Sequence, residues 1–361
     1  MRIVFISHLS PVASTGPNYS VPGRIGGQSL IDDVYWVNLT DVVREEWIEK
    51  PYFHNLSEIG ELRLEIIEQR FPNIDIVVFE GFYNMSHVKF SKELRKRKIP
   101  YIIVPRSSLT KQALHNKSWL KKKIAHWLFF NSYCHHALAI QFLTKRELED
   151  SGSHWCKTNL VIPNGFDIPK ISKRVFFKKG IQAVFVGRID AYQKGLDVLL
   201  KACYSVQDQL RANHFSLTLY GPEKVSDYER IKSEIASCKI GDIVKMGGEV
   251  LGKEKEKALL DADLFVLTSR FEGHPMGLLE ALAYGLPVIV SPGSNMAEEV
   301  AGTDSGWVCE TAPNSIKHCL LQVLRSREDF TKKGENARRL ASKYDWRLIA
   351  KKFHDEIEKV K

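Results

Sequence analysis

The sequence is poor in cysteine, and its cysteines follow no pattern. The six cysteines form no Cys-x-x-Cys pair and no short, even spacing. This scatter argues against a disulfide framework or a zinc site, and it fits reduced thiols in a cytosol. The positions are Cys134, Cys156, Cys203, Cys238, Cys309 and Cys319.

Long apolar runs are missing as well. No stretch of the 361 residues approaches the roughly 18 uninterrupted apolar residues that a membrane-spanning helix needs. The opening segment Met1–Pro11 has too short an apolar run for a signal peptide and lacks a cleavage site. We therefore expect a cytoplasmic protein.

Acidic residues are nearly absent from one stretch. Lys89–Arg146 contains fourteen Lys and Arg but a single acid, Glu93, whereas Met1–Val88 contains six basic and twelve acidic residues. Such an excess attracts anionic surfaces, among them nucleic acid, acidic lipid headgroups and phosphate-bearing substrates. Within it, residues 119–130 place Trp, Leu, Ile and Phe at helical spacing beside lysines. This pattern predicts either a helix at the inner face of an anionic plasma membrane or a helix packed on the sheet.

The composition and the apolar rhythm predict a doubly wound α/β fold. A chain of 361 residues with 44% hydrophobic and 26% charged residues is typical of soluble proteins and long enough for two domains. Short apolar runs alternate with helical patterns in both halves. In the first half the expected strands are 2–7, 74–79, 101–104, 139–143 and 160–163, and the expected helices 58–71 and 85–98. The segment Ser10–Gly27 is interpreted as a loop rich in Gly, Pro and Ser.

A linker separates the two halves. Phe166–Gly180 is irregular, basic and contains proline, as linkers do. We expect domains at 1–165 and 166–346. In the second domain the expected strands are 183–186, 215–220, 243–246, 264–268, 287–290 and 306–308. The expected helices are 275–284, 297–300, 313–325, 330–342 and 346–360.

Two glutamates flank the start of one expected helix. Glu272 lies in the loop before it and Glu280 lies eight residues later, with Gly273 and Gly277 around the turn. Ligands of parallel sheets bind beyond the carboxyl ends of the strands, where helix N-termini attract anions. Both acids can therefore address one elongated ligand. The alternative is that Glu272 only caps the helix dipole and that Glu280 is solvated.

A Gly-Arg pair and a Lys-Gly pair follow the first strand of the second domain. Gly187 permits a close approach of the backbone, and Arg188 and Lys194 are suited to phosphate oxygens. Surface ion pairs would explain these residues equally well. A second short pattern, Asp261-Ala262-Asp263, resembles a metal-binding Asp-x-Asp motif. It stands at the amino end of a strand, the wrong edge for a ligand, so we assign it to a helix end and predict no metal.

Together these motifs resemble family 4 nucleotide-sugar glycosyltransferases. The resemblance rests on Glu-x7-Glu within EGHPMGLLEALAYGLPVI and on Gly-Arg-x5-Lys-Gly. It implies a retaining enzyme of the GT-B fold, in which two Rossmann-like domains face each other across a cleft. It also implies that a C-terminal helix, 347–361, crosses back to complete the first domain. No cofactor is implied, because the nucleotide sugar is a substrate.

The resemblance also assigns roles to residues. Glu272, Arg188 and Lys194 are the implied catalytic residues: the two cations hold the phosphates, and Glu272 binds the donor-sugar hydroxyls. Glu280 binds the ribose hydroxyls, and no protein nucleophile is named. The remaining implied donor-binding residues are Gly16, Gly187, Gly273, His274, Met276, Gly277, Leu278 and Val250. For Gly16 a plain turn is the alternative.

One departure from the family concerns the acceptor side. Many members carry His where this chain has Arg106, in VPRSSL. An arginine cannot act as a base at neutral pH. We therefore expect Arg106 to hold an anionic acceptor, such as a lipid-linked sugar diphosphate or an acidic glycan.

Three functional hypotheses follow from these patterns. The first is a glycosyltransferase that moves a hexose or N-acetylhexosamine from a nucleotide sugar, with UDP favoured, to a glycan or lipid-linked acceptor of cell-surface polysaccharide or glycolipid. The second is a sugar-nucleotide epimerase on the same fold. The third is a basic protein that binds membranes or nucleic acid. Because the third leaves the glutamate pair unexplained, we expect no nucleic-acid partner.

Overall fold

The computed structural model describes residues 1–11, 16–114, 126–173, 175–177, 180–223 and 227–361. It divides the chain into two compact units. Unit 1 comprises Met1–Gly165 and Trp346–Lys361, and unit 2 comprises Phe166–Asp345. Each unit has a hydrophobic core of its own.

Unit 1 is built on a parallel sheet of seven strands, in the order β3-β2-β1-β4-β5-β6-β7. Alternate residues of its central strands enter two separate apolar clusters, one on each face of the sheet. This explains why the strands are apolar on both sides, as expected for a sheet with helices on both faces. The strands are β1 (Arg2–Ser7), β2 (Asp33–Asn38), β3 (Phe53–Asn55), β4 (Ile76–Glu80), β5 (Tyr101–Val104), β6 (Ala139–Phe142) and β7 (Asn159–Val161).

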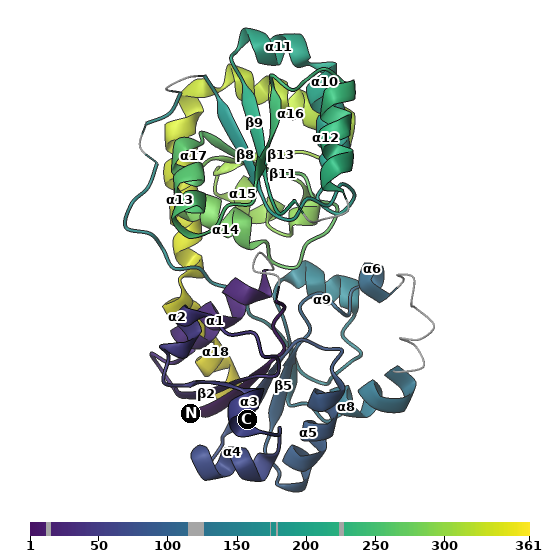
Figure 1. The fold of residues 1–361 in the computed structure, drawn as a ribbon, viewed down its shortest axis with the longest axis vertical. Helices are drawn as coiled ribbons and strands as arrows, with labels where there is room; N and C mark the ends of the chain where they lie inside the picture. Colours follow the sequence, from purple (N-terminus) through teal and green to yellow (C-terminus); the bar gives the residue numbers. More distant parts are fainter. Residues whose placement is uncertain (12–15, 115–125, 174, 178–179, 224–226) are drawn as a thin grey trace. The chain divides into compact units, whose positions relative to one another are not determined.

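The helices of unit 1 cover both faces of this sheet (Figure 1). They are α1 (Pro17–Gln28), α2 (Glu45–Ile48), α3 (Leu56–Ile59), α4 (Leu64–Arg70), α5 (Met85–Lys96), α6 (Lys111–Leu114), η1 (His126–Phe130), α8 (Asn131–His135), α9 (Lys145–Ser151) and α18 (Trp346–Val360). The helix expected at 58–71 is two short helices, and the strand β2 was not anticipated.

The expected loop Ser10–Gly27 was wrong, because most of it is helix α1. Pro17 stands in the first turn, where its missing N–H costs nothing. Val21 and Ile25 are fully buried in the core. The packing of this apolar face outweighs the poor helix propensity of its glycines and of Pro22.

The glycines of α1 serve the contact with the C-terminal helix. A Cβ atom on Gly23 would lie 2.5 Å from the Trp346 ring, and one on Gly27 would lie 2.9 Å from the Trp346 backbone. Trp346 therefore lies directly on the backbone of α1, with no side chain of α1 at these two positions. Figure 1 shows α18, in yellow, beside the purple α1.

Unit 2 is built on a parallel sheet of six strands, in the order β10-β9-β8-β11-β12-β13. The strands are β8 (Gln182–Val186), β9 (Ser216–Tyr220), β10 (Val244–Gly248), β11 (Leu264–Leu267), β12 (Val288–Val290) and β13 (Gly306–Val308). The chain runs outward from β8 to β10 and then returns to β11 on the other side of β8. The pair β8 and β11 is therefore the topological switch point, where ligands of such sheets bind.

The helices of unit 2 form two layers around its sheet (Figure 1). They are α10 (Leu196–Ser205), α11 (Gln207–Ala212), α12 (Tyr228–Ser237), α13 (Gly252–Asp261), α14 (Met276–Ala283), η2 (Pro292–Ser294), α15 (Ala297–Gly302), α16 (Pro313–Arg325), η3 (Arg327–Asp329), α17 (Phe330–Ala341) and η4 (Ser342–Tyr344). The predicted fold class, two doubly wound α/β units, is confirmed.

The segment expected to be a linker packs on unit 2. The rings of Phe176 and Phe177 contact Phe330 at centroid distances of 5.9 and 4.7 Å. Lys173 Nζ lies 3.1 Å from the buried carboxylate of Asp263. These contacts make the described part of this segment a component of the core of unit 2 and correct its interpretation as a free linker.

Most of the predicted basic aromatic helix, residues 119–125, lies outside the described residues. The described part of that pattern is the π-helical turn η1, in which Leu128 and Phe129 are exposed. Among the helices of the described residues, none is both long and apolar enough to cross a membrane.

Candidate functional site

The candidate site begins where β8 and β11 end. The loop 187–195 follows β8 and leads to α10, and the loop 268–275 follows β11 and leads to α14. Three glycines let these segments meet: a Cβ on Gly195 would lie 2.1 Å from the Thr268 carbonyl oxygen, and one on Gly277 would lie 2.7 Å from the Val186 carbonyl oxygen. A Cβ on Gly187 would touch Phe185 at 3.1 Å. The first turn of α14 therefore lies directly at the carboxyl end of β8.

An ion pair joins the two loops. Lys194 Nζ lies 2.6 Å from Glu272 Oε1, and the Ser269 hydroxyl donates to the same oxygen at 2.6 Å. The side chains of Lys194 and Glu272 are 13% and 8% exposed. Within the described part of the chain, Glu272 Oε2 has no hydrogen-bond partner, so it can accept hydrogen bonds from a ligand.

Asn295 holds the backbone of the Glu272 loop. Its side-chain amide donates to the carbonyl oxygens of Glu272 and Gly273, at 2.5 and 2.9 Å. Asn295 adopts the left-handed conformation, with φ of 61°, which asparagine tolerates better than most residues. Sequence analysis missed Asn295 and Ser269, because neither belongs to a recognisable motif.

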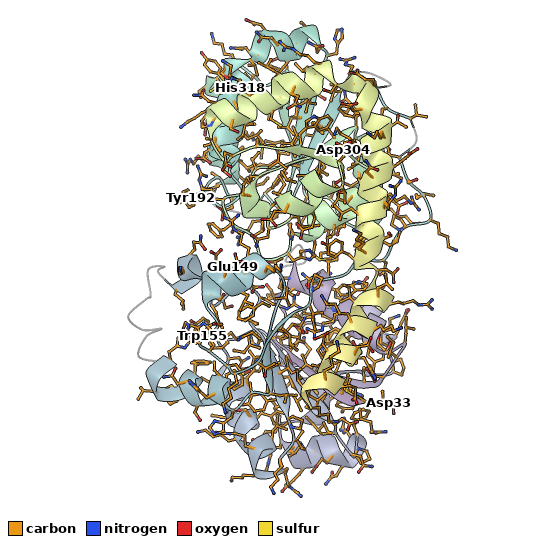
Figure 2. All side chains as sticks on the ribbon, turned by 180° about the vertical axis from the view of Figure 1, so that it is seen from behind. Asp33, Glu149, Trp155, Tyr192, Asp304 and His318 are labelled. Atoms are coloured by element: carbon orange, nitrogen blue, oxygen red, sulfur yellow. The ribbon has the colours of Figure 1, made fainter. Side chains whose placement is uncertain are left out.

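A second charged pair joins the same two loops. Arg270 donates to both carboxylate oxygens of Asp197, at 2.7 and 2.9 Å, and to the Tyr192 carbonyl oxygen at 2.6 Å. Its guanidinium also lies 4.4 Å from the centre of the Tyr192 ring. Figure 2 shows Tyr192 at the surface. Sequence analysis did not name these residues either.

Arg188 lies on the same loop as Lys194 but is much more open to solvent. Its side chain is 55% exposed and lies 3.6 Å from Asp190. Its guanidinium donates to the Gln193 side chain, and Gln193 donates in turn to the Phe271 carbonyl oxygen at 3.3 Å. Arg188 is therefore tied to the Glu272 loop through Gln193, with nitrogen atoms facing solvent.

Glu280 lies on the second turn of α14 and is almost fully buried. Its carboxylate pairs with Lys255 of α13. Burial raises the pKa of Glu280, and the charge of Lys255 acts in the opposite direction. Lys255 also was not named from the sequence, because nothing local links it to a residue 25 positions away.

The other implied donor residues surround the start of α14 and the end of β10. His274 is buried beside the Tyr344 ring, and burial lowers its pKa to about 3, so it is neutral at physiological pH. Leu278 is fully buried, which leaves only its backbone for a ligand, whereas Met276 and Gly273 are half-buried. Val250 lines a separate pocket of about 820 Å³ between α13 and the sheet.

The second carboxylate of the Asp-x-Asp pattern is used internally. Asp261 ends α13, as predicted. Asp263 accepts from the Phe177 and Gln182 amides at 3.0 and 2.9 Å and pairs with Lys173. Its carboxylate therefore anchors the segment after residue 166. No three His, Cys, Asp or Glu side chains gather as metal ligands among the described residues.

In unit 1, the implied residues are Gly16 and Arg106. Gly16 precedes α1, and its carbonyl oxygen accepts from the Tyr19 and Ser20 amides. Arg106 follows β5. Its Nε donates to the Glu80 carboxylate at 2.8 Å, and its Nη1 donates to the Ser20 hydroxyl at 2.9 Å. Its guanidinium is thus largely neutralised within unit 1.

The fold places the chain in the class of two-domain GT-B proteins. The sucrose-phosphate synthase of Thermosynechococcus elongatus has a TM-score of 0.76 and 17% identity, over 99% of this chain and 98% of that chain. HepE of Anabaena, solved in complex with UDP and glucose, has a TM-score of 0.74 and 15% identity. The match covers 99% of this chain and 100% of that chain. At these identities the likeness shows the fold alone.

Sequence comparison then gives the family. The model of the family described as Glycosyl transferases group 1 matches residues 167–340, which is most of unit 2. The putative colanic acid biosynthesis glycosyltransferase WcaL of Escherichia coli (strain K12) is 31% identical over 150 residues, which is 40% of this chain and 35% of the relative. The chain thus spans about a third of that relative's length. The resemblance is confirmed at the level of the group 1 family.

Proposed function

We propose that the chain is a retaining glycosyltransferase that transfers a hexose or N-acetylhexosamine from a UDP-sugar to a glycan or lipid-linked acceptor. The observation that carries this proposal is the Lys194–Glu272 ion pair at the β8–β11 switch point. It brings a cation suited to phosphate and a carboxylate suited to sugar hydroxyls to one place.

The chemistry requires charge stabilisation at two centres. When a sugar–diphosphate bond breaks, negative charge grows on the departing phosphate and positive charge on the anomeric carbon. Arg188, with its exposed guanidinium, and Lys194 stabilise the phosphate. Glu272 uses Oε2 to bind donor-sugar hydroxyls and faces the positive centre, while its Oε1 stays fixed by Lys194 and Ser269. The acceptor attacks on the side of the leaving group, and the departing phosphate takes its proton. No metal takes part in this scheme.

The relatives support the choice of donor and pathway. HepE was solved with UDP and glucose, which supports a UDP-sugar donor on the shared fold. WcaL is described as a colanic acid biosynthesis glycosyltransferase, which supports a role in making surface polysaccharide.

Among the unit 1 residues, Gly16 is proposed to approach the diphosphate. Because Glu80 and Ser20 occupy its guanidinium, Arg106 is proposed to shape the acceptor side through the loop it orders.

Contact with an anionic membrane is part of the proposal. In unit 1, exposed Leu128 and Phe129 lie in η1, which packs beside α8, and Arg95 of the basic helix α5 donates to Ser132 of α8. Exposed apolar side chains beside basic ones suit the interface of anionic lipids. Flotation with phosphatidylglycerol vesicles should recover the chain, and phosphatidylcholine vesicles should not.

The test is incubation of the purified chain with tritiated UDP-, GDP- and ADP-sugars. Slow hydrolysis of one donor without acceptor, and transfer with a membrane extract, are expected. In this assay Glu272→Gln should lose turnover. The matched control is Glu298→Gln, which changes an exposed glutamate of α15 and should keep turnover. Recovery of an epimerised donor, or no turnover with any donor, would refute the proposal.

A further inference from the structure

A buried ion pair lies in unit 2 beside the candidate site. Glu280 and Lys255 approach each other across α14 and α13, with side chains 6% and 16% exposed. Neither residue is needed to explain how the two helices pack, since their apolar residues already enter the core. An isolated pair of this kind is costly to bury, so its position next to the site calls for a reason.

Two further titratable groups lie near Glu280, and neither is a cation. Tyr284, which follows α14, interacts with Glu256 of α13 and with Glu280, and burial together with these charges raises the pKa of its hydroxyl to about 12, so it stays neutral. On α17, which packs against α14, the buried Lys333 pairs with Asp304. Among the described residues, Lys255 is thus the cation that faces the Glu280 carboxylate.

We propose that Lys255 is a residue of the nucleoside site that keeps Glu280 ionised, so that this carboxylate can accept hydrogen bonds from ribose hydroxyls. The inference rests on the proposed function, a nucleotide-sugar donor at the β8–β11 edge, and it takes Glu280, on the second turn of α14, as the carboxylate that meets the ribose of that donor. A protonated Glu280 would have to donate a proton of its own and would lose acceptor capacity. In the free protein Lys255 therefore pairs with the Glu280 carboxylate. When the nucleotide binds, the two ribose hydroxyls donate to this carboxylate and replace part of the contact with Lys255.

Removing the cation changes the pH at which the carboxylate ionises. Burial already raises the pKa of Glu280, and Lys255 opposes that rise. Without Lys255 the carboxyl takes up its proton at higher pH, so nucleotide affinity falls as the pH is lowered through the new pKa. Below that pKa the affinity drops about tenfold for each pH unit, since one pH unit is a factor of ten in protonation.

The experiment is calorimetric titration of UDP into the wild type and Lys255→Met at about pH 6, 7 and 8. GDP and ADP take the place of UDP if the wild type does not bind UDP. Comparison with the wild type at the same pH corrects the affinities for ionisation of the nucleotide itself. Relative to the wild type, Lys255→Met should lose affinity progressively as the pH is lowered, approaching about tenfold for each pH unit once the carboxyl is protonated, and should recover as the pH rises. Lys255→Arg, which keeps the charge, should follow the wild type.

The control is Lys201→Met, which removes an exposed lysine of α10. It should show the affinity and pH profile of the wild type. If Lys255→Met lowers only the melting temperature and keeps the wild-type pH profile, Lys255 is a structural tie and the inference is overturned. If the wild type binds none of the three nucleotides, the proposed function itself is overturned, and the inference with it. Should Lys255→Met not fold, a tenfold pH-dependent loss in Lys255→Gln supports the inference and its absence overturns it.

Discussion

The two units share one topology but use their switch points differently. At the switch point of unit 1, Arg24 donates to Glu80 at 2.9 Å and to Gln141 at 2.6 Å, and Arg106 binds the other oxygen of Glu80. This network satisfies its own charges and is nearly closed to solvent. At the switch point of unit 2, by contrast, the Arg188 side chain is 55% exposed, and the buried Glu272 keeps one carboxylate oxygen, Oε2, without a hydrogen-bond partner among the described residues. The same sheet edge can therefore be closed by internal pairs or left open to bind a ligand.

Breaking the closed network should give the largest effect. Arg24→Met leaves Glu80 buried with one cation fewer and Gln141 without its donor. Removal of one partner from a buried pair costs about 3 kcal/mol in the free energy of unfolding. Urea denaturation measures this loss. Arg188→Met, at the open end of unit 2, should stay within about 0.5 kcal/mol of the wild type. Equal losses for the two variants would remove the distinction between the units.

Substitutions at the open site of unit 2 should lower catalytic activity. Lys194→Met removes the cation that holds Glu272 Oε1 and, under the proposed function, stabilises the leaving phosphate. We expect a loss of about a hundredfold in kcat, in the range seen when one such preorganised group is removed. The assay is transfer from the donor found by the tritiated-sugar screen, with the exposed Lys201→Met as the control. Unchanged kcat in Lys194→Met would contradict the role of the ion pair.

The contrast between the units also explains what could be predicted. The unit 2 site was visible because short motifs encode it: Gly187-Arg188, Lys194-Gly195 and the two glutamates stand at fixed spacings. Lys255 and Asn295 were invisible, since each reaches its partner only through tertiary packing. Helix α1 was missed for the same reason. Its glycines look like a loop until Trp346, more than 300 residues later, supplies the surface that they fit.

A smaller effect tests the packing of α1 on α18. Gly23→Ala places a methyl group 2.5 Å from the Trp346 indole, closer than any real contact, so one of the helices must shift. Overpacking of this kind costs about 1–3 kcal/mol. The same substitution at Gly16, where no described atom beyond its chain neighbours lies within 4 Å of the added carbon, should change the free energy of unfolding by much less. Equal stability of Gly23→Ala and the wild type would show that the two helices do not pack so closely.

The smallest effect concerns the partly buried pair Arg270–Asp197, which joins the loop after β11 to the first turn of α10. Arg270→Lys keeps the charge but cannot bind both oxygens of Asp197, so we expect a loss below about 1 kcal/mol and a few-fold fall in kcat.

Complete removal of the cation, in Arg270→Ala, should cause a loss of stability that depends on pH. Burial raises the pKa of Asp197, but the hydrogen bond and charge of Arg270 outweigh this effect, so that the pKa lies below the ordinary value of 3.8. A carboxyl whose pKa is lowered on folding stabilises the protein above its unfolded pKa, and this stabilisation disappears as the pH falls through its folded pKa. The difference in unfolding free energy between wild type and Arg270→Ala should therefore be constant from pH 7 to about pH 5 and shrink below pH 3.8. A difference that persists in acid would mean that Arg270 acts through its contact with the Tyr192 ring, which does not titrate in that range.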